Sequence, residues 1–310
     1  MGVAVDSAAR TFVEVTEVWV PEGDRLVLAG GNYGGHAEFA SVSGRESFAR
    51  GEGLPGRAWD AARPIVLKGL DGSTFKRIEA ARAAGLTSAV AVPVFAGAEL
   101  KAVLVVLCGD DATRTGAIEI WAERDGLLML EDGYYGAARH FEWVSQHTHF
   151  PRGQGLPGGV WAADTPILMR DLGAGYRFIR ADSAGRAGLT TGLGLPVPAP
   201  GGPARVLTLL SARGTPIARR FELWDARPAR VGKSGGAVLV DGICAREGKL
   251  WDAEAPRQAA PWQGLIGRVL GTGLPLAETG APGLAAGYDQ MVAIPVYQGR
   301  ELAHIVAWYL

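Results

Sequence analysis

The phrase Gly51-Glu-Gly53-Leu54-Pro55-Gly56-Arg-Ala-Trp59 recurs later in the chain as Gly153-Gln-Gly155-Leu156-Pro157-Gly158-Gly-Val-Trp161. A phrase that recurs at a fixed offset indicates a duplicated structural unit. The copies extend well beyond the phrase, because other motifs match at almost the same offset: Glu17-Val-Trp19 with Glu119-Ile-Trp121, and Val92-Pro-Val94 with Leu195-Pro-Val197. The sequence therefore predicts that a whole domain has been duplicated.

A third copy follows, and it is degenerate. Glu222-Leu-Trp224 opens it, Gly264-Leu-Ile-Gly267 replaces the repeated phrase, and Ile294-Pro-Val296 closes it. The stretch between its Gly-Leu turn and its final Pro motif is shorter than in the first two copies. We therefore expect three domains of about 100 residues, called here unit 1 (1–113), unit 2 (114–216) and unit 3 (217–310).

Composition narrows the function. The 310 residues carry 31 Lys and Arg against 32 Asp and Glu, which leaves no charge excess to hold nucleic acid or an anionic membrane surface. Cys108 and Cys244 lie in different units, which favours a reducing compartment over a disulfide framework. No secretory leader is visible, and the longest apolar run, 89–98, is too short to span a bilayer. A cytoplasmic protein is expected.

Each unit shows the same order of patterns: two strands, a helix, the Gly-Pro turn, a strand, a second helix and two strands. Strands joined mostly by hairpins predict an α+β fold, in which a mainly antiparallel sheet carries helices on one face. The two glycines of the turn permit positive φ, and Pro55 opens a helical turn that carries Trp59 inward. In unit 1 the predicted strands are 15–20, 25–28, 64–70, 89–95 and 100–107, and the predicted helices are 37–50 and 75–84, the second recurring at 178–187.

This order of motifs resembles the GAF domain, a small-molecule sensor module of bacterial signalling proteins. The resemblance covers units 1 and 2 nearly end to end, but in unit 3 only the Gly-Leu turn and the final hairpin. It implies a ligand pocket between the sheet and the helix before the final hairpin. The chain departs from the family by lacking long terminal helices and an output domain, so we expect any signal to pass through a separate protein partner.

The pocket candidates come from the second helix and the repeated phrase. Phe75 and Phe178 are expected to face the sheet, and Arg77 and Arg180 to reach an anionic or carbonyl group of a ligand. The alternative is that the aromatic residues are core and the arginines are solvated. Unit 3, which has lost the helix, is expected to have little pocket. The predicted ligand-binding residues are Trp59, Phe75, Arg77, Trp161, Tyr176, Arg177, Phe178 and Arg180.

Other motifs give no chemistry. The repeated phrase satisfies Gly-x-Gly-x-x-Gly but follows a predicted helix, whereas a dinucleotide site requires a preceding strand. His140, His147 and His149 do not share one helix face, so surface histidines are expected rather than a metal site. Cys108 ends an apolar strand and is expected to be a buried thiol. The resemblance includes a free-methionine-sulfoxide reductase, which needs several cysteines in one unit, so no catalysis is expected here.

Two functions stay open. The first is a non-enzymatic cytoplasmic sensor that binds a small metabolite in unit 1 or 2 and signals through a separate protein; the sequence names no cofactor and permits a homo-oligomer. The second is a scaffold in which the units pack into a rod or a ring, as the 45 glycines allow. Closed, filled interiors in all three units would favour the scaffold.

Overall fold

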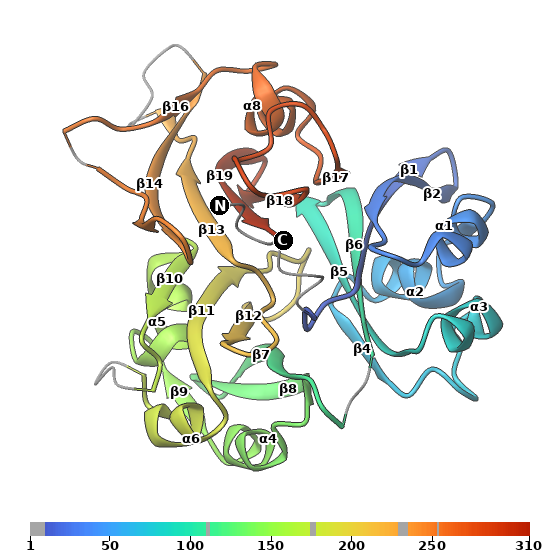
Figure 1. The fold of residues 1–310 in the computed structure, drawn as a ribbon, viewed down its shortest axis with the longest axis horizontal. Helices are drawn as coiled ribbons and strands as arrows, with labels where there is room; N and C mark the ends of the chain where they lie inside the picture. The colour runs from blue at the N-terminus through green and yellow to red at the C-terminus, as the bar shows by residue number, and fades with distance from the viewer. Residues whose placement is uncertain (1–9, 110–111, 174–177, 229–234, 253) are drawn as a thin grey trace, which may run out of the picture.

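The computed structural model describes residues 10–109, 112–173, 178–228, 235–252 and 254–310. Of the predicted site residues, Tyr176 and Arg177 lie outside this part of the chain. The described residues form three antiparallel sheets with a few helices (Figure 1). The expected α+β class with antiparallel sheets is therefore confirmed.

The first sheet has the strand order β3-β2-β1-β6-β5-β4. The long hairpin β5/β6 is almost entirely buried, and its near-continuous apolar runs are typical of strands covered on both faces. The two central strands of the sheet are β1 and β6. Its strands are β1 (Val15–Glu22), β2 (Arg25–Asn32), β3 (Ser47–Ala49), β4 (Ile65–Lys68), β5 (Leu86–Ala96) and β6 (Glu99–Gly109).

The other two sheets repeat this order. The second runs β10-β11-β12-β7-β8-β9 and the third β15-β14-β13-β19-β18-β17, with β16 paired to β14. The strands of the second sheet are β7 (Thr115–Arg124), β8 (Leu127–Gly136), β9 (His149–Pro151), β10 (Ile167–Arg170), β11 (Leu189–Pro196) and β12 (Arg205–Ala212). Those of the third are β13 (Arg220–Asp225), β14 (Ala237–Cys244), β15 (Gly248–Lys249), β16 (Gln258–Ala259), β17 (Leu276–Thr279), β18 (Gln290–Gln298) and β19 (Glu301–Tyr309).

The helices follow the repeat as well. Units 1 and 2 each have three, and unit 3 keeps α8 at the repeated phrase but has no helix in the described residues between β17 and β18, as its shortened sequence predicted. The helices are α1 (Ala37–Ser43), α2 (Gly53–Ala61), α3 (Ile78–Ala83), α4 (Arg139–Gln146), α5 (Gly155–Ala163), α6 (Ala181–Arg186) and α8 (Gly264–Thr272).

Two helix predictions were wrong in extent. The helix predicted over 37–50 ends at Ser43, and Phe48 lies on β3, where its ring packs edge-on against the Trp19 ring at 4.8 Å. The spacing from Phe39 to Phe48 fits a helical period, but pairing of β3 with β2 fixes Phe48 as an extended residue. The second helices begin later than predicted, at Ile78 and Ala181, because the Phe-x-Arg segments before them form turns.

The repeated phrase forms a tight turn into a helix. Gly51 and Gly53 have φ of +82° and +57°, so the predicted positive φ is confirmed. Gly56 has a different role, since a Cβ there would overlap the carbonyl oxygen of Ala49. The same overlap would occur at Gly158 and Gly267, so all three helices pack backbone to backbone against the preceding segment.

The faces of the sheets that lack helices pack together in one shared core. Within β1, Val18 faces this shared core while Trp19 faces the interior of unit 1. The Pro motifs of all three units meet there, since 92–95, 195–198 and 294–297 line one small cavity. The three sheets therefore surround a common centre. Along β1, successive side chains point alternately into this shared core and into the interior of unit 1, so both faces of the strand are buried.

Matching edges join neighbouring units in the same way. Lys68 of β4 lies 3.2 Å from Asp132 of β8, and Arg170 of β10 pairs with Asp241 of β14. At the third junction, Thr279 of β17 donates to Asn32 of β2 at 3.0 Å. Each junction uses the outer strand of one unit and the second strand of the next, so the units close into a ring.

Candidate functional site

A buried carboxylate occupies the interior of every unit. Glu17, Glu119 and Glu222 lie at matching positions on β1, β7 and β13 and are 0%, 0% and 2% exposed. In each case the indole N–H of the tryptophan two residues later donates to the carboxylate, at 3.0, 3.1 and 3.0 Å. A buried carboxylate is costly unless it is paired with a cation, so the cation in each unit defines the site.

In unit 1 the cation is Arg77, the residue before α3. Its guanidinium forms two hydrogen bonds with Glu17, one from Nη1 and one from Nη2 at 2.8 Å. Four aromatic rings surround it, with centroids 4.8 to 5.9 Å from the guanidinium carbon: Trp19, Phe39, Phe48 and Phe75. Such a paired, aromatic-lined guanidinium ties the helix layer to the sheet.

Unit 2 repeats this arrangement with Arg180 and Glu119. Arg180 Nη2 donates to Glu119 at 2.9 Å, and Ser145 and Thr208 also donate to the carboxylate, at 2.9 and 2.8 Å. Burial acts to raise the pKa of Glu119, but the Arg180 guanidinium and these hydroxyl donors outweigh it, and the pKa is lowered overall. Glu119 is therefore held as a charged carboxylate inside the unit.

Unit 3 supplies its cation from the strand itself. Arg220, two residues before Glu222 on β13, donates to it from Nε at 2.8 Å and also reaches Glu247 at 2.8 Å. The Tyr309 hydroxyl donates to Glu222 at 3.1 Å. The charge and hydrogen bonds of Glu222 are thus satisfied in unit 3 without the missing helix.

The predicted site residues fall into two groups. Phe75, Arg77, Phe178 and Arg180 are all buried and meet inside their units, so the alternative that the arginines are solvated is wrong. Trp59 and Trp161 are partly buried and pack against the apolar cores of units 1 and 2. Leu54 and Ala58 of α2 lie deeper in unit 1 and are 1% and 0% exposed.

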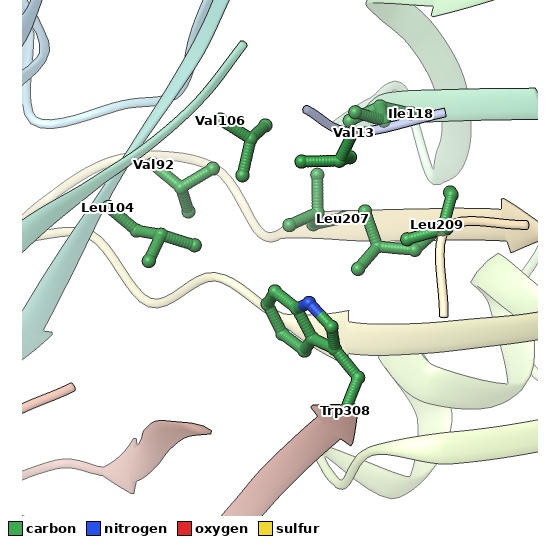
Figure 2. Close-up of a pocket in the computed structure, with 9 residues that line it drawn as sticks. Val13, Val92, Leu104, Val106, Ile118, Leu207, Leu209 and Trp308 are labelled. Carbon is green, nitrogen blue, oxygen red and sulfur yellow. The ribbon is translucent and has the colours of Figure 1, made fainter. Parts of the chain in front are cut away.

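Two small cavities lie between the units, with volumes of about 10 and 20 Å³. The first is lined by side chains from all three units, including Val92, Leu207 and Trp308 (Figure 2). A space of this size holds about one water at most.

The remaining chemical candidates are isolated. Among the described residues no three His, Cys, Asp or Glu side chains are grouped to hold a metal ion. His140 and His147 are exposed on α4, on either side of Trp143. Cys108 is buried as expected, and Cys244 is buried with its sulfur 3.1 Å from the Tyr288 hydroxyl. In the described chain, no helix combines the length and apolar character needed to cross a bilayer.

Comparison with known proteins gives likenesses of fold only. No protein-family model matches the chain, and no curated protein matches it either. Several solved structures do resemble part of it. The neighbours are mostly GAF domains. The A. aeolicus nlh2 GAF domain is 23% identical with a TM-score of 0.27, over 31% of this chain and 58% of that one.

Two further GAF-like neighbours are more distant in sequence. Free methionine-R-sulfoxide reductase from Neisseria meningitidis is 18% identical with a TM-score of 0.24, over 31% of this chain and 51% of that chain. A mutated NreA protein from Staphylococcus aureus is 16% identical with a TM-score of 0.27, over 34% and 81%. The chain spans little more than half the length of the first two structures, and at these scores none supports an argument about function.

The residue that sequence reasoning missed in these GAF-like units is the buried glutamate. Glu-x-Trp was recognised as a marker of the repeat, without a role for Glu17, Glu119 or Glu222. The signal was present, since a carboxylate that recurs three times in an apolar strand next to a tryptophan needs a buried cation. Pairing it with Arg77 or Arg180 required the fold, because those partners lie about 60 residues away.

Proposed function

We propose that this chain is a cytoplasmic, non-enzymatic regulatory scaffold, in which three GAF-like units closed into a ring present their outer surfaces to a separate protein partner. The observation that carries this proposal is the buried ion pair inside units 1 and 2. Arg77 and Arg180, which could bind an anionic ligand, are already paired with Glu17 and Glu119 and lie against aromatic rings. Two free cysteines agree with a reducing compartment.

The ion pair between Arg77 and Glu17 makes ligand binding inside unit 1 costly. A ligand that took Arg77 from Glu17 would leave that carboxylate buried without a cation, which costs about 3–5 kcal/mol. The ligand would also have to pass the four aromatic rings that surround the Arg77 guanidinium. A paired and enclosed arginine therefore suits a protein that acts through its surface.

A metabolite sensor is the second candidate, and one observation favours it. The Nε atoms of Arg77 and Arg180 are buried and have no hydrogen-bond partner among the described residues. Each guanidinium thus keeps a donor that a small anion such as a carboxylate or nitrate can use. In this case an anion would enter unit 1 or unit 2 and loosen the helix layer.

Native mass spectrometry and calorimetry on the purified protein distinguish the two. The scaffold predicts no retained ligand and no heat with a panel of small carboxylates, phosphate and nitrate. Glu17→Ala serves as the positive control, because removing the carboxylate leaves Arg77 free to take acetate, which should raise the melting temperature of that variant alone. Binding of a metabolite to the wild type that is lost in Arg77→Met would support the sensor and reject the scaffold.

A further inference from the structure

One buried position on the last strand of each unit carries a different kind of residue in each copy. Pairing with the strand that holds the tryptophan aligns Ala102 of unit 1 with Arg205 of unit 2 and His304 of unit 3. These residues are 0%, 9% and 5% exposed. His304 faces the shared core together with Val306 and Trp308, because side chains alternate along a strand. The same place in the fold is thus apolar, permanently charged or titratable.

Unit 2 shows what a buried cation needs at this position. Arg205 donates to Glu131 from Nε at 2.7 Å and from Nη2 at 3.3 Å. Glu131 is the extra residue of a bulge in β8, and the matching bulges in β2 and β14 place Ala29 and Val240 there. The arginine of unit 2 therefore has a carboxylate of its own, whereas unit 3 has a valine in the place of that carboxylate.

The carboxylate beside His304 belongs to Asp225, its partner on β13. Asp225 accepts hydrogen bonds from the backbone N–H and Nε of Arg227, both at 3.0 Å, and from Nη2 at 2.7 Å. On the other side, on β18, the partner of His304 is the apolar Val296. His304 Nδ1 is buried and has no hydrogen-bond partner among the described residues. In the imidazolium both ring nitrogens carry a proton, so Nδ1 would become a buried donor without an acceptor.

The surroundings of His304 favour its neutral form. Burial is the largest cause and lowers the pKa of His304; Asp225 acts in the opposite direction, Arg227 adds to the lowering, and the pKa lies below its ordinary value of 6.5. The unfolded chain therefore takes up the proton first as pH falls. The stability that neutral His304 provides is complete well above pH 6.5 and is lost as pH falls through 6.5 towards the folded-state pKa.

We propose that His304 is an acid-sensitive switch, whose uncharged ring packs in the shared core at neutral pH and whose protonation in mild acid loosens β19 and opens the ring of units. Trp308 of the same strand lines the cavity at which all three units meet (Figure 2). Loosening β19 therefore acts on the contact among the units. Ala102 never carries a charge and Arg205 always does, so at this position only unit 3 responds to pH. This inference goes beyond the proposed function and does not depend on it.

Urea titration of the full chain between about pH 8 and about pH 5.5 tests the switch, because exposed carboxylates stay charged over this range. We expect the equilibrium constant for unfolding of the wild type to rise about five- to tenfold from the higher to the lower pH. His304→Gln keeps a polar side chain that cannot take up a proton, so its rise should be less than about twofold. His147→Gln is the matched control, since His147 is exposed on α4, and it should behave like the wild type.

Two further measurements locate the effect. The NMR signal of the His304 ring, assigned by its absence in His304→Gln, should titrate below pH 6.5 in the wild type. At about pH 5.5, amide hydrogen exchange in β13 and β19 should be faster in the wild type than in His304→Gln. If His304→Gln does not fold, His304→Ala, which installs the unit 1 residue, replaces it. A full pH response in the variant, a His304 ring that titrates at or above pH 6.5, or faster exchange spread evenly over all three units would overturn the proposal.

Discussion

Units 1 and 3 hold the same buried carboxylate by different means. In unit 1 the cation for Glu17 is Arg77, which arrives from the helix layer across the interior. In unit 3 the helix is absent, and Arg220 on the same strand takes over beside Glu222. The tryptophan donor is retained in both, at 3.0 Å. The carboxylate and its indole are thus the fixed part of the unit, while the source of the cation can change.

This difference explains how unit 3 can lose a helix without leaving a buried charge unpaired. Arg220 is only two residues from Glu222 on the same strand, so it neutralises the glutamate whatever the conformation of the chain after β17. In units 1 and 2 the ion pair has a second task, since it anchors the segment before α3 or α6 to the sheet. The comparison predicts that breaking the pair of Arg77 and Glu17 disturbs the helix layer of unit 1. In unit 3 the pair of Arg220 and Glu222 lies within one strand, so it holds no helix in place.

The strongest test of this comparison is Arg77→Met. Glu17 would then be buried without a cation, and we expect the free energy of unfolding to fall by about 3–5 kcal/mol. Arg180→Met should fall in the same range, because unit 2 repeats the arrangement. Urea titration followed by fluorescence and circular dichroism provides the measurement.

Arg82→Ala is the control for this pair of variants. Arg82 also forms ion pairs, but its side chain is 56% exposed, so its loss should change stability by no more than about 0.5 kcal/mol. A loss of less than about 1 kcal/mol in Arg77→Met would show that Glu17 does not need Arg77 as its cation, and the anchoring role would then fail.

Gly56→Ala tests the feature that all three units share. The added Cβ would overlap the carbonyl oxygen of Ala49, so the α2 backbone must move, at a cost of about 1–3 kcal/mol. Gly44→Ala is the matched control, since Gly44 has φ of −64° and an added Cβ would meet only ordinary contacts, 3.6 and 3.9 Å from the carbonyl oxygens of Ala40 and Ser41. It should be neutral or slightly stabilising. Equal effects at the two positions would refute the close-packing role of the repeated phrase.

Much of the fold followed from the sequence because the repeat supplied its own comparison. The antiparallel hairpins, the positive φ of Gly51 and Gly53, and the missing helix of unit 3 could all be predicted from matching positions. Phe48 was assigned to a helix because its spacing from Phe39 fits a helical period, and only pairing with β2 makes it a strand residue.

Only part of the candidate site could be predicted from the sequence. The buried aromatic residues and arginines were predicted as a group, but their partner Glu17 was not assigned a role. The sequence could not pair it, because the partner of a buried charge depends on sheet register and on contacts between distant segments. The ring of three units was predicted only as an alternative. Local sequence does not show that the sheet faces without helices are apolar because they pack against one another.

Acid titration probes the ion pair of unit 2 through its charge. The pKa of Glu119 in the fold lies below its ordinary value of 4.5, so the unfolded chain takes up the proton first as pH falls. The stability that the pair provides is therefore complete above about pH 5 and is lost as pH falls through the folded-state pKa. The double variant Glu119→Gln with Arg180→Met removes this group, and its free energy of unfolding should depend less on pH between about 5 and 3.

The smallest expected effect concerns the junctions between units. Lys68→Ala removes ion pairs with Asp132 at 3.2 Å and Glu142 at 3.4 Å, and should cost no more than about 0.5 kcal/mol because the lysine is 47% exposed. Arg170→Ala at the matching junction should cost more, about 1 kcal/mol, because Arg170 is 32% exposed and also donates to the Gly242 carbonyl at 3.0 Å. Urea titration of both variants checks the order. If Lys68→Ala were the more damaging, the junctions would not be equivalent, and the ring would be held mainly at the contact between units 1 and 2.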